Sequence, residues 1–204
     1  MWGGSTSVGS NAVQLAVAAG YEVVTTASPR NYERMRALGA SAVFDYASDT
    51  VVRDITAALH GKSVAGVFAI GTGSAEPSVA IAAATGAKRV SLASPSVSLA
   101  KLPRRTGPSL QLVSIGARLV SSNVALQVRA RRAGIRVRFV WGSSLMANEV
   151  GPMIWRDSLP AALAEGRYVA APEPEVVGAG LERVQEALDR LHGGVSARKL
   201  VVTL

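Results

Sequence analysis

The sequence predicts an α/β protein whose parallel strands form one doubly wound sheet with helices on both faces. Short apolar segments rich in β-branched residues alternate with helical patterns, which is typical of βαβ units. A glycine-rich turn precedes the first helical pattern. Charged residues make up 18% of the 204 residues, below the roughly 25% usual in soluble domains, as expected for strands covered on both faces.

The predicted elements follow this alternation along the chain. Apolar residues recur at helical spacing after Gly9 until Gly20, which occupies the position of a helix C-terminal glycine. The remaining strands are predicted over 21–26, 41–44, 64–70, 89–93, 135–141 and 199–204, and 135–141 alternates like an edge strand. The remaining helices are predicted over 30–38, 50–59, 75–85, 158–165 and 181–191. Segment 112–133 is compatible with a helix of poor apolar period, and PEPEVVG (172–178) is predicted to be a connection.

The turn at residues 1–9, MWGGSTSVG, is typical of a phosphate-binding loop. Glycine lets the backbone approach a pyrophosphate closely, and the helix that follows presents unpaired N–H groups and a positive dipole end. In the dinucleotide fingerprint Gly4 and Gly9 fit, whereas Thr6 replaces the middle glycine. The turn therefore predicts a dinucleotide site, with an ordinary Gly/Ser-rich loop as the alternative.

The end of the predicted strand 21–26 bears on which dinucleotide would bind. An NAD-binding chain places Asp or Glu there to hold the ribose 2′-hydroxyl. This chain instead has Ser28 and Arg30, whose hydroxyl and guanidinium would bind a 2′-phosphate by charge-assisted hydrogen bonds. We predict NADPH as the cofactor; the alternative is that Ser28 caps the next helix and Arg30 is merely solvated.

Composition argues against metal and membrane chemistry. The chain has no cysteine and only two histidines, His60 and His192, so no metal site is predicted and no Ser-His-Asp set is recognisable. No apolar run reaches the roughly 18 residues of a membrane span, and no secretory signal pattern is present. We therefore expect a soluble, cytoplasmic protein without a membrane partner.

The net charge of +8 is regional. Between Glu76 and Glu149 the chain has eleven Lys and Arg residues and no acidic residue. A nucleic-acid-binding protein is therefore a second hypothesis, but the region has few aromatic residues for base stacking and no groove-reading motif. A small-molecule substrate is the preferred prediction.

Several motifs together resemble the medium-chain dehydrogenase/reductase superfamily, most closely its zinc-free quinone oxidoreductase and trans-enoyl reductase branch. These motifs are GGSTSVG, TTASPRNYERMRALGA, FDY, IGTGS, FVWGSSL and the ending LERVQEALDRLHGGVSARKLVVTL. Gly3, Val8 and Gly9 fit the family's turn pattern, while Thr6 departs from it. The resemblance implies a Rossmann-type fold and hydride transfer from NADPH to an activated alkene (enoyl) or quinone-like acceptor.

The resemblance also implies roles for particular residues. Ser5, Thr6 and Val8 would contact phosphate together with Gly4 and Gly9 of the turn. Ser28, Arg30 and Tyr32 would surround the 2′-phosphate, and Tyr46 would lie near the adenine. The nicotinamide end would be approached by Gly71, Gly73, Ala93, Ser94, Gly142 and Ser143. No catalytic residue is assigned, and a homodimer is one expected assembly.

Compared with the family, the chain departs in two places. Nothing corresponds to the N-terminal GroES-like catalytic domain, and the first strand of the sheet is expected to be truncated. We therefore expect an NAD(P)-binding domain over 1–162 and a terminal segment over 163–204 that in the family returns to the catalytic domain. Residues 101–134 form an atypical basic stretch, and three alternatives stay open for it: an insertion of this lineage, a disordered loop, or a translated sequence that selection has not shaped. A truncated, non-catalytic remnant remains an alternative, and the isolated chain is expected to lack turnover.

Overall fold

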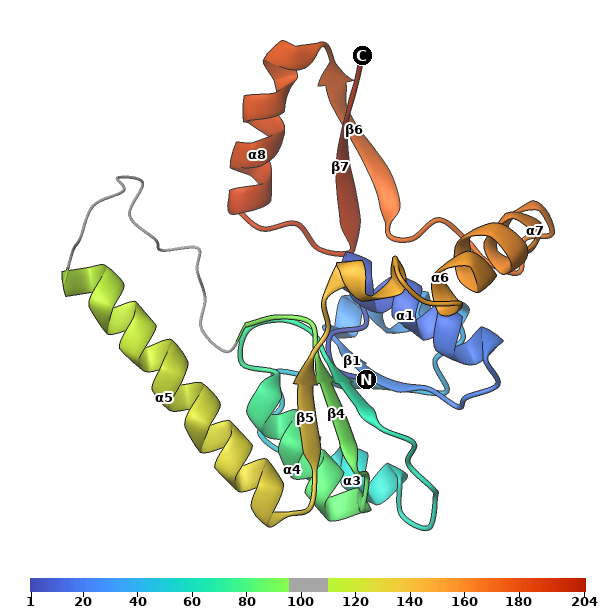
Figure 1. The fold of residues 1–204 in the computed structure, drawn as a ribbon. Coiled ribbons are helices and arrows are strands. Elements are labelled where there is room, and N and C mark those ends of the chain that lie inside the picture. Colours follow the sequence, from blue (N-terminus) through green and yellow to red (C-terminus); the bar gives the residue numbers. More distant parts are fainter. Residues whose placement is uncertain (96–109) are drawn as a thin grey trace. The chain divides into compact units, whose positions relative to one another are not determined.

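The computed structural model of the protein describes residues 1–95 and 110–204 (Figure 1). Their contacts divide the chain into two compact units. The first unit comprises Met1–Gly3 and Tyr46–Trp141, and the second comprises Gly4–Asp45 and Gly142–Leu204. Each unit combines helices with parallel strands, so the predicted α/β class is confirmed.

The first unit has a three-stranded parallel sheet in the order β3-β4-β5. Its strands are β3 (Val67–Ala69), β4 (Arg89–Leu92) and β5 (Arg136–Phe139), and its helices are α3 (Val51–Ala58), α4 (Ala75–Thr85) and α5 (Leu110–Arg132). Val90 lies opposite both Val67 and Val137. Trp2 adds an isolated parallel bridge to Ala69, through N–H···O bonds with Phe68 and Ile70.

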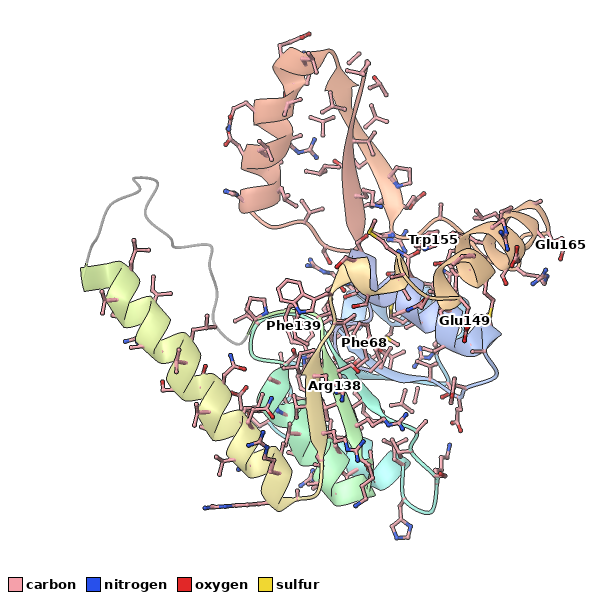
Figure 2. The ribbon with its side chains drawn as sticks, in the orientation of Figure 1. Phe68, Arg138, Phe139, Glu149, Trp155 and Glu165 are labelled. Atoms are coloured by element: carbon pink, nitrogen blue, oxygen red, sulfur yellow. The ribbon has the colours of Figure 1, made fainter. Side chains whose placement is uncertain are left out.

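Helix α4 packs against this sheet. Helix α4 contacts β3 and β4 as well as α3 and α5. Its Val79, Ile81 and Ala82 are buried, as is Val90 of β4. Strand β5 ends the sheet and buries Val137 while Arg136 and Arg138 are exposed, which confirms the predicted edge strand (Figure 2).

The second unit begins with helix α1 (Ser7–Ala18), followed by strand β1 (Val24–Ala27), a 3₁₀ turn (Pro29–Asn31), helix α2 (Tyr32–Ala37) and strand β2 (Ala42–Asp45). β1 and β2 pair in parallel, with Val24 opposite Ala42. All four residues of β1 are buried, as expected for its β-branched run. After α1, Gly20 has φ +83° and its N–H donates to the Val17 carbonyl, which confirms the predicted helix end.

The later part of the second unit contains mostly short helical segments and one further sheet. The segments are η2 (Gly142–Leu145), α6 (Val150–Pro152), the π-helical η3 (Met153–Ser158), α7 (Leu159–Ala164), η4 (Leu181–Arg183) and α8 (Val184–His192). The sheet consists of β6 (Glu173–Ala179) and β7 (Arg198–Thr203), paired in parallel with an irregularity between Val176 and Gly178. The prediction of a connection over 172–178 was wrong: among the described strands β6 pairs with β7 alone, and an edge strand tolerates Pro174.

Two polar side chains of α1 hold the chain that leads into β6. The Gln14 amide exchanges hydrogen bonds with Val169, and the Asn11 Nδ2 donates to the Ala171 carbonyl at 3.0 Å. The Tyr168 hydroxyl donates to Asn11 Oδ1 at 2.6 Å. These bonds join residues that are more than 150 positions apart in the chain.

Element bounds agree with the predictions to within a few residues in most places. Helix α4 covers the predicted 75–85, whereas β3 is shorter than the predicted 64–70. The stretch 112–133 is the single helix α5 (Leu110–Arg132), and residues 101–109 of the predicted insertion lie outside the described residues. The described strands form three small parallel sheets, so one doubly wound sheet, like the domain bounds 1–162 and 163–204, stays a prediction.

Candidate functional site

The glycine-rich turn closes onto the N-terminus of α1. Thr6 is the N-cap residue, and its Oγ1 accepts from the Gly9 N–H at 3.0 Å. The Gly4 N–H donates to the Thr26 carbonyl at 2.9 Å, and the Ser10 hydroxyl donates to the Gly4 carbonyl at 3.1 Å. These bonds fix the turn against β1 and orient the first turn of the helix.

Two glycines of the turn are required by close packing. Gly3 has φ +83°, and a Cβ there would lie 2.7 Å from the Ile70 carbonyl oxygen. A Cβ on Gly4 would collide with the Thr25 hydroxyl and lie 3.1 Å from the Met35 sulfur. Close packing against β1 and α2 therefore explains why residue 4 is a glycine.

The exposed first turn of α1 is suited to an anion. Helix geometry leaves the N–H groups of Ser7 and Val8 without partners inside the helix, and both residues are exposed. The first turn contains no acidic residue that would compete for the positive dipole end. Ser5 precedes the cap and is half-buried.

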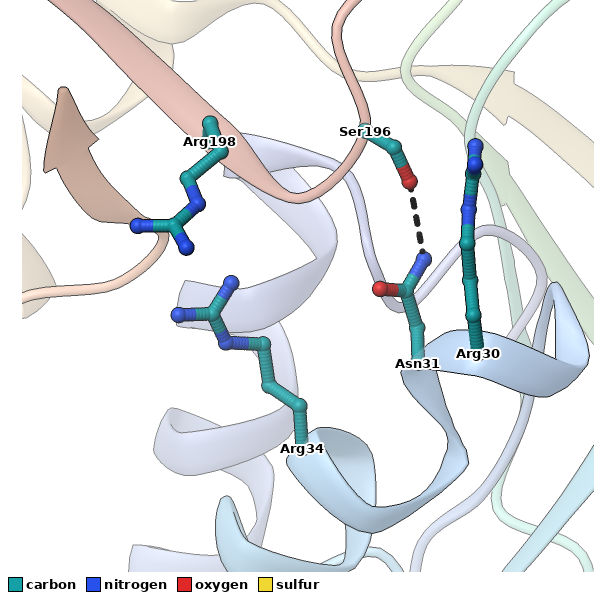
Figure 3. A pocket seen from close by; sticks show the side chains of 5 residues that line it. All are labelled: Arg30, Asn31, Arg34, Ser196 and Arg198. Atoms are coloured by element: carbon teal, nitrogen blue, oxygen red, sulfur yellow. Dashed lines mark hydrogen bonds between the residues drawn. The ribbon is translucent and has the colours of Figure 1, made fainter.

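An arginine-rich pocket of about 420 Å³ lies beyond the end of β1 (Figure 3). Residues from the α2 region and from the start of β7 line it, namely Arg30, Asn31, Arg34, Ser196 and Arg198. The Asn31 Nδ2 donates to both Ser28 Oγ (2.9 Å) and Ser196 Oγ (3.1 Å). The pocket therefore offers guanidinium, amide and hydroxyl groups, the donors that bind phosphate.

One carboxylate pairs with two of the pocket arginines. Glu173 Oε2 accepts from Arg34 at 3.0 Å and from Arg198 at 2.9 Å. Arg34 also donates to the Ala197 carbonyl. Among the ion pairs recorded for the described residues, Arg30 has no carboxylate partner, and its side chain is exposed.

Of the three residues predicted around a 2′-phosphate, Arg30 lines the pocket, Ser28 adjoins it and Tyr32 does neither. Arg36 lies 5.8 Å above the Tyr32 ring. Burial and the neighbouring Asp45 carboxylate raise the pKa of Tyr32, whereas Arg36 lowers it. The prediction omitted Asn31, Arg34, Ser196 and Arg198. Arg34 follows Arg30 by one helical turn, a signal that could have found it.

In the first unit, the residues predicted for the nicotinamide end form a separate cluster. The Gly71 N–H donates to Ser94 Oγ at 2.8 Å, and the Ser74 hydroxyl donates to the Gly71 carbonyl at 2.6 Å. The Ala93 N–H donates to the Ala69 carbonyl at 2.9 Å. A Cβ on Gly71 or Gly73 would meet open space. The turns after β3 and β4 thus meet at one edge of the sheet.

The remaining predicted residues are exposed. Tyr46 is 52% exposed in the first unit. Gly142 and Ser143 lie in η2 of the second unit, where the Ser143 carbonyl accepts from the Met146 N–H at 3.0 Å. Residues 1–95 and 110–204 contain no group of three or more His, Cys, Asp or Glu that could hold a metal ion. No helix in those same ranges is long and apolar enough to cross a membrane.

Parallel α/β units with a helix N-terminus and an arginine pocket after one strand define a candidate nucleotide-binding protein. No protein-family model matches this chain. It is similar to dehydrogenase pigH of Monascus ruber, with 43% identity over 100% of this chain and 54% of that protein. It is also 33% identical to trans-enoyl reductase himH of Aspergillus japonicus, over 100% of this chain and 51% of that protein.

Solved structures agree on the fold. A quinone oxidoreductase of Pseudomonas syringae matches with TM-score 0.65 and 21% identity, over 100% of this chain and 55% of that one. CurA of Vibrio vulnificus, in complex with NADPH, matches with TM-score 0.63 and 17% identity, over 99% and 55%. This chain belongs to the medium-chain dehydrogenase/reductase superfamily, in the zinc-binding alcohol dehydrogenase-like and trans-enoyl reductase family. It spans about half the length of the curated relatives it matches.

Proposed function

We propose that this chain is the NADPH-binding portion of a zinc-independent oxidoreductase that transfers hydride to an activated alkene or quinone-like acceptor. The observation that carries the proposal is the arginine pocket beyond β1, in the same unit as the capped N-terminus of α1. The α1 terminus suits a pyrophosphate and the arginine pocket suits a 2′-phosphate. NADPH contains both groups, whereas NADH contains only the pyrophosphate.

The residues present fit this cofactor. The turn residues Gly4, Ser5, Thr6, Val8 and Gly9 would hold the pyrophosphate. Arg30, Asn31, Arg34, Ser196 and Arg198 would hold the 2′-phosphate, with Ser28 bound to Asn31. When bound, NADPH supplies the hydride, and the protein supplies orientation and electrostatic stabilisation.

Further assignments are extensions of the same proposal. We assign Tyr46 to the adenine and the Gly71–Ser94 cluster, with Gly73, Ala93, Gly142 and Ser143, to the nicotinamide end. We keep Tyr32 near the 2′-phosphate in the proposal, where it follows Asn31 without lining the pocket. The Rossmann-type, doubly wound arrangement is part of the proposal and is supported by the fold of the Vibrio vulnificus and Pseudomonas syringae proteins.

The proposed type of acceptor is supported by the names of the relatives rather than by a residue of this chain. One relative is named a trans-enoyl reductase, and a structurally similar protein is a quinone oxidoreductase. Both names describe reduction of an electron-poor double bond or carbonyl system. For the whole enzyme we propose a small-molecule substrate of this kind.

A binding titration tests the proposal. NADPH and NADH are titrated into the chain while reduced-nicotinamide fluorescence is recorded, and 2′,5′-ADP is compared with 5′-AMP by thermal shift. We expect NADPH and 2′,5′-ADP to bind more tightly than the partners that lack the 2′-phosphate. Equal affinity within each pair would overturn the NADPH preference, and no binding of any of the four would overturn the cofactor-binding function.

A further inference from the structure

Glu173, at the first position of β6, connects two arginines of the pocket through one oxygen atom. Its Oε2 lies 3.0 Å from Arg34 Nη2 and 2.9 Å from Arg198 Nη1. Figure 3 shows the guanidinium group of Arg198 above that of Arg34, with the two groups facing each other. Two guanidinium groups that bind the same carboxylate oxygen repel each other, so the carboxylate between them stabilises their position.

The bonds to Glu173 leave donors available on both arginines. A guanidinium has five N–H donors. The recorded bonds of Arg34 use its Nη1 for the Ala197 carbonyl and its Nη2 for Glu173, and the recorded bond of Arg198 uses its Nη1. Each side chain can therefore stay anchored while its other N–H groups face an anion.

The charges of the pocket also match a phosphomonoester. Three guanidinium groups and one carboxylate leave two net positive charges among Arg30, Arg34, Arg198 and Glu173. A phosphomonoester carries about −1.5 to −2 at neutral pH. The carboxylate thus holds two arginines in place and still leaves a complementary charge.

We propose that Glu173 is a positioning residue that sets the preference for a 2′-phosphate by holding Arg34 and Arg198 at the pocket. This inference rests on the proposed NADPH-binding function. It predicts that Glu173 acts on 2′-phosphate binding alone, since it contacts neither the turn at α1 nor an adenine site in the recorded bonds of the described residues. An ordinary surface ion pair would instead affect only stability, and by little.

The test uses Glu173→Gln, which removes the charge and keeps the side-chain shape. The matched control is Glu175→Gln, because Glu175 lies on the same strand and pairs with Arg190 of α8 instead of a pocket residue. NADPH and NADH affinities are measured for both variants and for the unchanged chain, with circular dichroism as a check of folding. We expect Glu173→Gln to weaken NADPH binding about three- to tenfold and to leave NADH binding unchanged.

Replacement of both arginines tests whether Glu173 acts through them. In an Arg34→Met, Arg198→Met background, Glu173→Gln should have no further effect on the ratio of NADPH to NADH affinity. An unchanged ratio in the single variant would overturn the positioning role while leaving the proposed function intact. Tighter NADPH binding would also overturn it, because Glu173 would then compete with the phosphate. If the unchanged chain shows no preference for NADPH, the proposed NADPH preference and this inference both fail, whereas the absence of any binding would overturn the cofactor-binding function as well.

Discussion

Gln14 of α1 forms two hydrogen bonds with the backbone of Val169. Its Nε2 donates to the Val169 carbonyl at 3.1 Å, and its Oε1 accepts from the Val169 N–H at 2.9 Å. Gln14 is 7% exposed, so its amide reaches the later segment from a buried position. This pairing joins α1 to the chain that leads into β6.

Replacement of Gln14 by leucine should loosen that segment. Both Val169 groups lose a partner, at a cost of about 1–2 kcal/mol in the free energy of unfolding. Amide hydrogen exchange at Val169 should accelerate, and chemical denaturation should give the stability change. Gln185→Leu is the control, because Gln185 bonds an exposed Asp189 on α8. Equal effects of the two substitutions would contradict the attachment role.

Tyr168→Phe should reduce the loss of stability at alkaline pH. Burial raises the pKa of Tyr168 above the ordinary tyrosine value of about 10. At pH values below the ordinary tyrosine pKa, the hydroxyl is protonated in both the folded and the unfolded state. Its contribution to stability is then complete. As pH rises further, the unfolded state loses its proton first, so stability falls until the folded pKa is passed. The free energy of unfolding, measured by denaturation at several pH values in this range, should fall less steeply with pH for the variant. Parallel plots for the variant and the unchanged chain would contradict the raised pKa of Tyr168.

Gly4→Ala should destabilise the second unit. The new methyl group would collide with the Thr25 hydroxyl and crowd Met35, at a cost of about 1–3 kcal/mol. Gly142→Ala is the matched control, because its Cβ would meet open space and its φ is not positive. A comparison of melting temperatures checks the prediction, which fails if both variants melt together.

Thr25→Val should stabilise the protein, whereas Ser10→Ala should destabilise it. Both side chains are fully buried. Among the described residues Thr25 Oγ1 has no hydrogen-bond partner, while the Ser10 hydroxyl donates to the Gly4 carbonyl. An unpaired buried hydroxyl costs about 1–3 kcal/mol, and valine removes it at similar volume. The denaturant midpoints of the two variants should therefore shift in opposite directions. A shift in the same direction would show that burial alone, and not hydrogen bonding, determines the effect on stability.

Arg30→Gln should lower NADPH affinity about tenfold with little change for NADH, because a charge-assisted bond to the 2′-phosphate is lost. The measurement is the fluorescence titration described for the unchanged chain. Arg167→Gln serves as the control, since Arg167 is exposed and pairs with Glu165 outside the pocket. A parallel loss of NADH affinity would indicate damage to the fold instead of a lost phosphate ligand.

Local sequence patterns were sufficient for the parallel α/β class. The alanine-rich helix α4 and the buried β-branched run of β1 follow from spacing and residue type alone. Strand β6 was missed because Pro174 and two glutamates resemble a turn, whereas its pairing partner β7 lies 25 positions later in the chain. The spacing of apolar residues and the β-strand propensity of single residues do not reveal such non-local pairing.

The candidate site was predictable only where its residues are neighbours in the chain. Ser28 and Arg30 follow β1 directly and lie at or beside the pocket. Ser196 and Arg198 reach it because β7 begins beside the α2 segment, as the Asn31 to Ser196 hydrogen bond records. Glu173 enters through two ion pairs that no spacing rule indicates.

The composition of the pocket has a consequence for synthesis of the protein. Arg30, Asn31 and Arg34 are synthesised more than 150 residues before Ser196 and Arg198. During synthesis the pocket is therefore incomplete until Ser196 and Arg198 have been added to the three lining residues that precede them. An anion that binds the completed pocket would therefore favour the docking of β7 and stabilise the folded state of the chain.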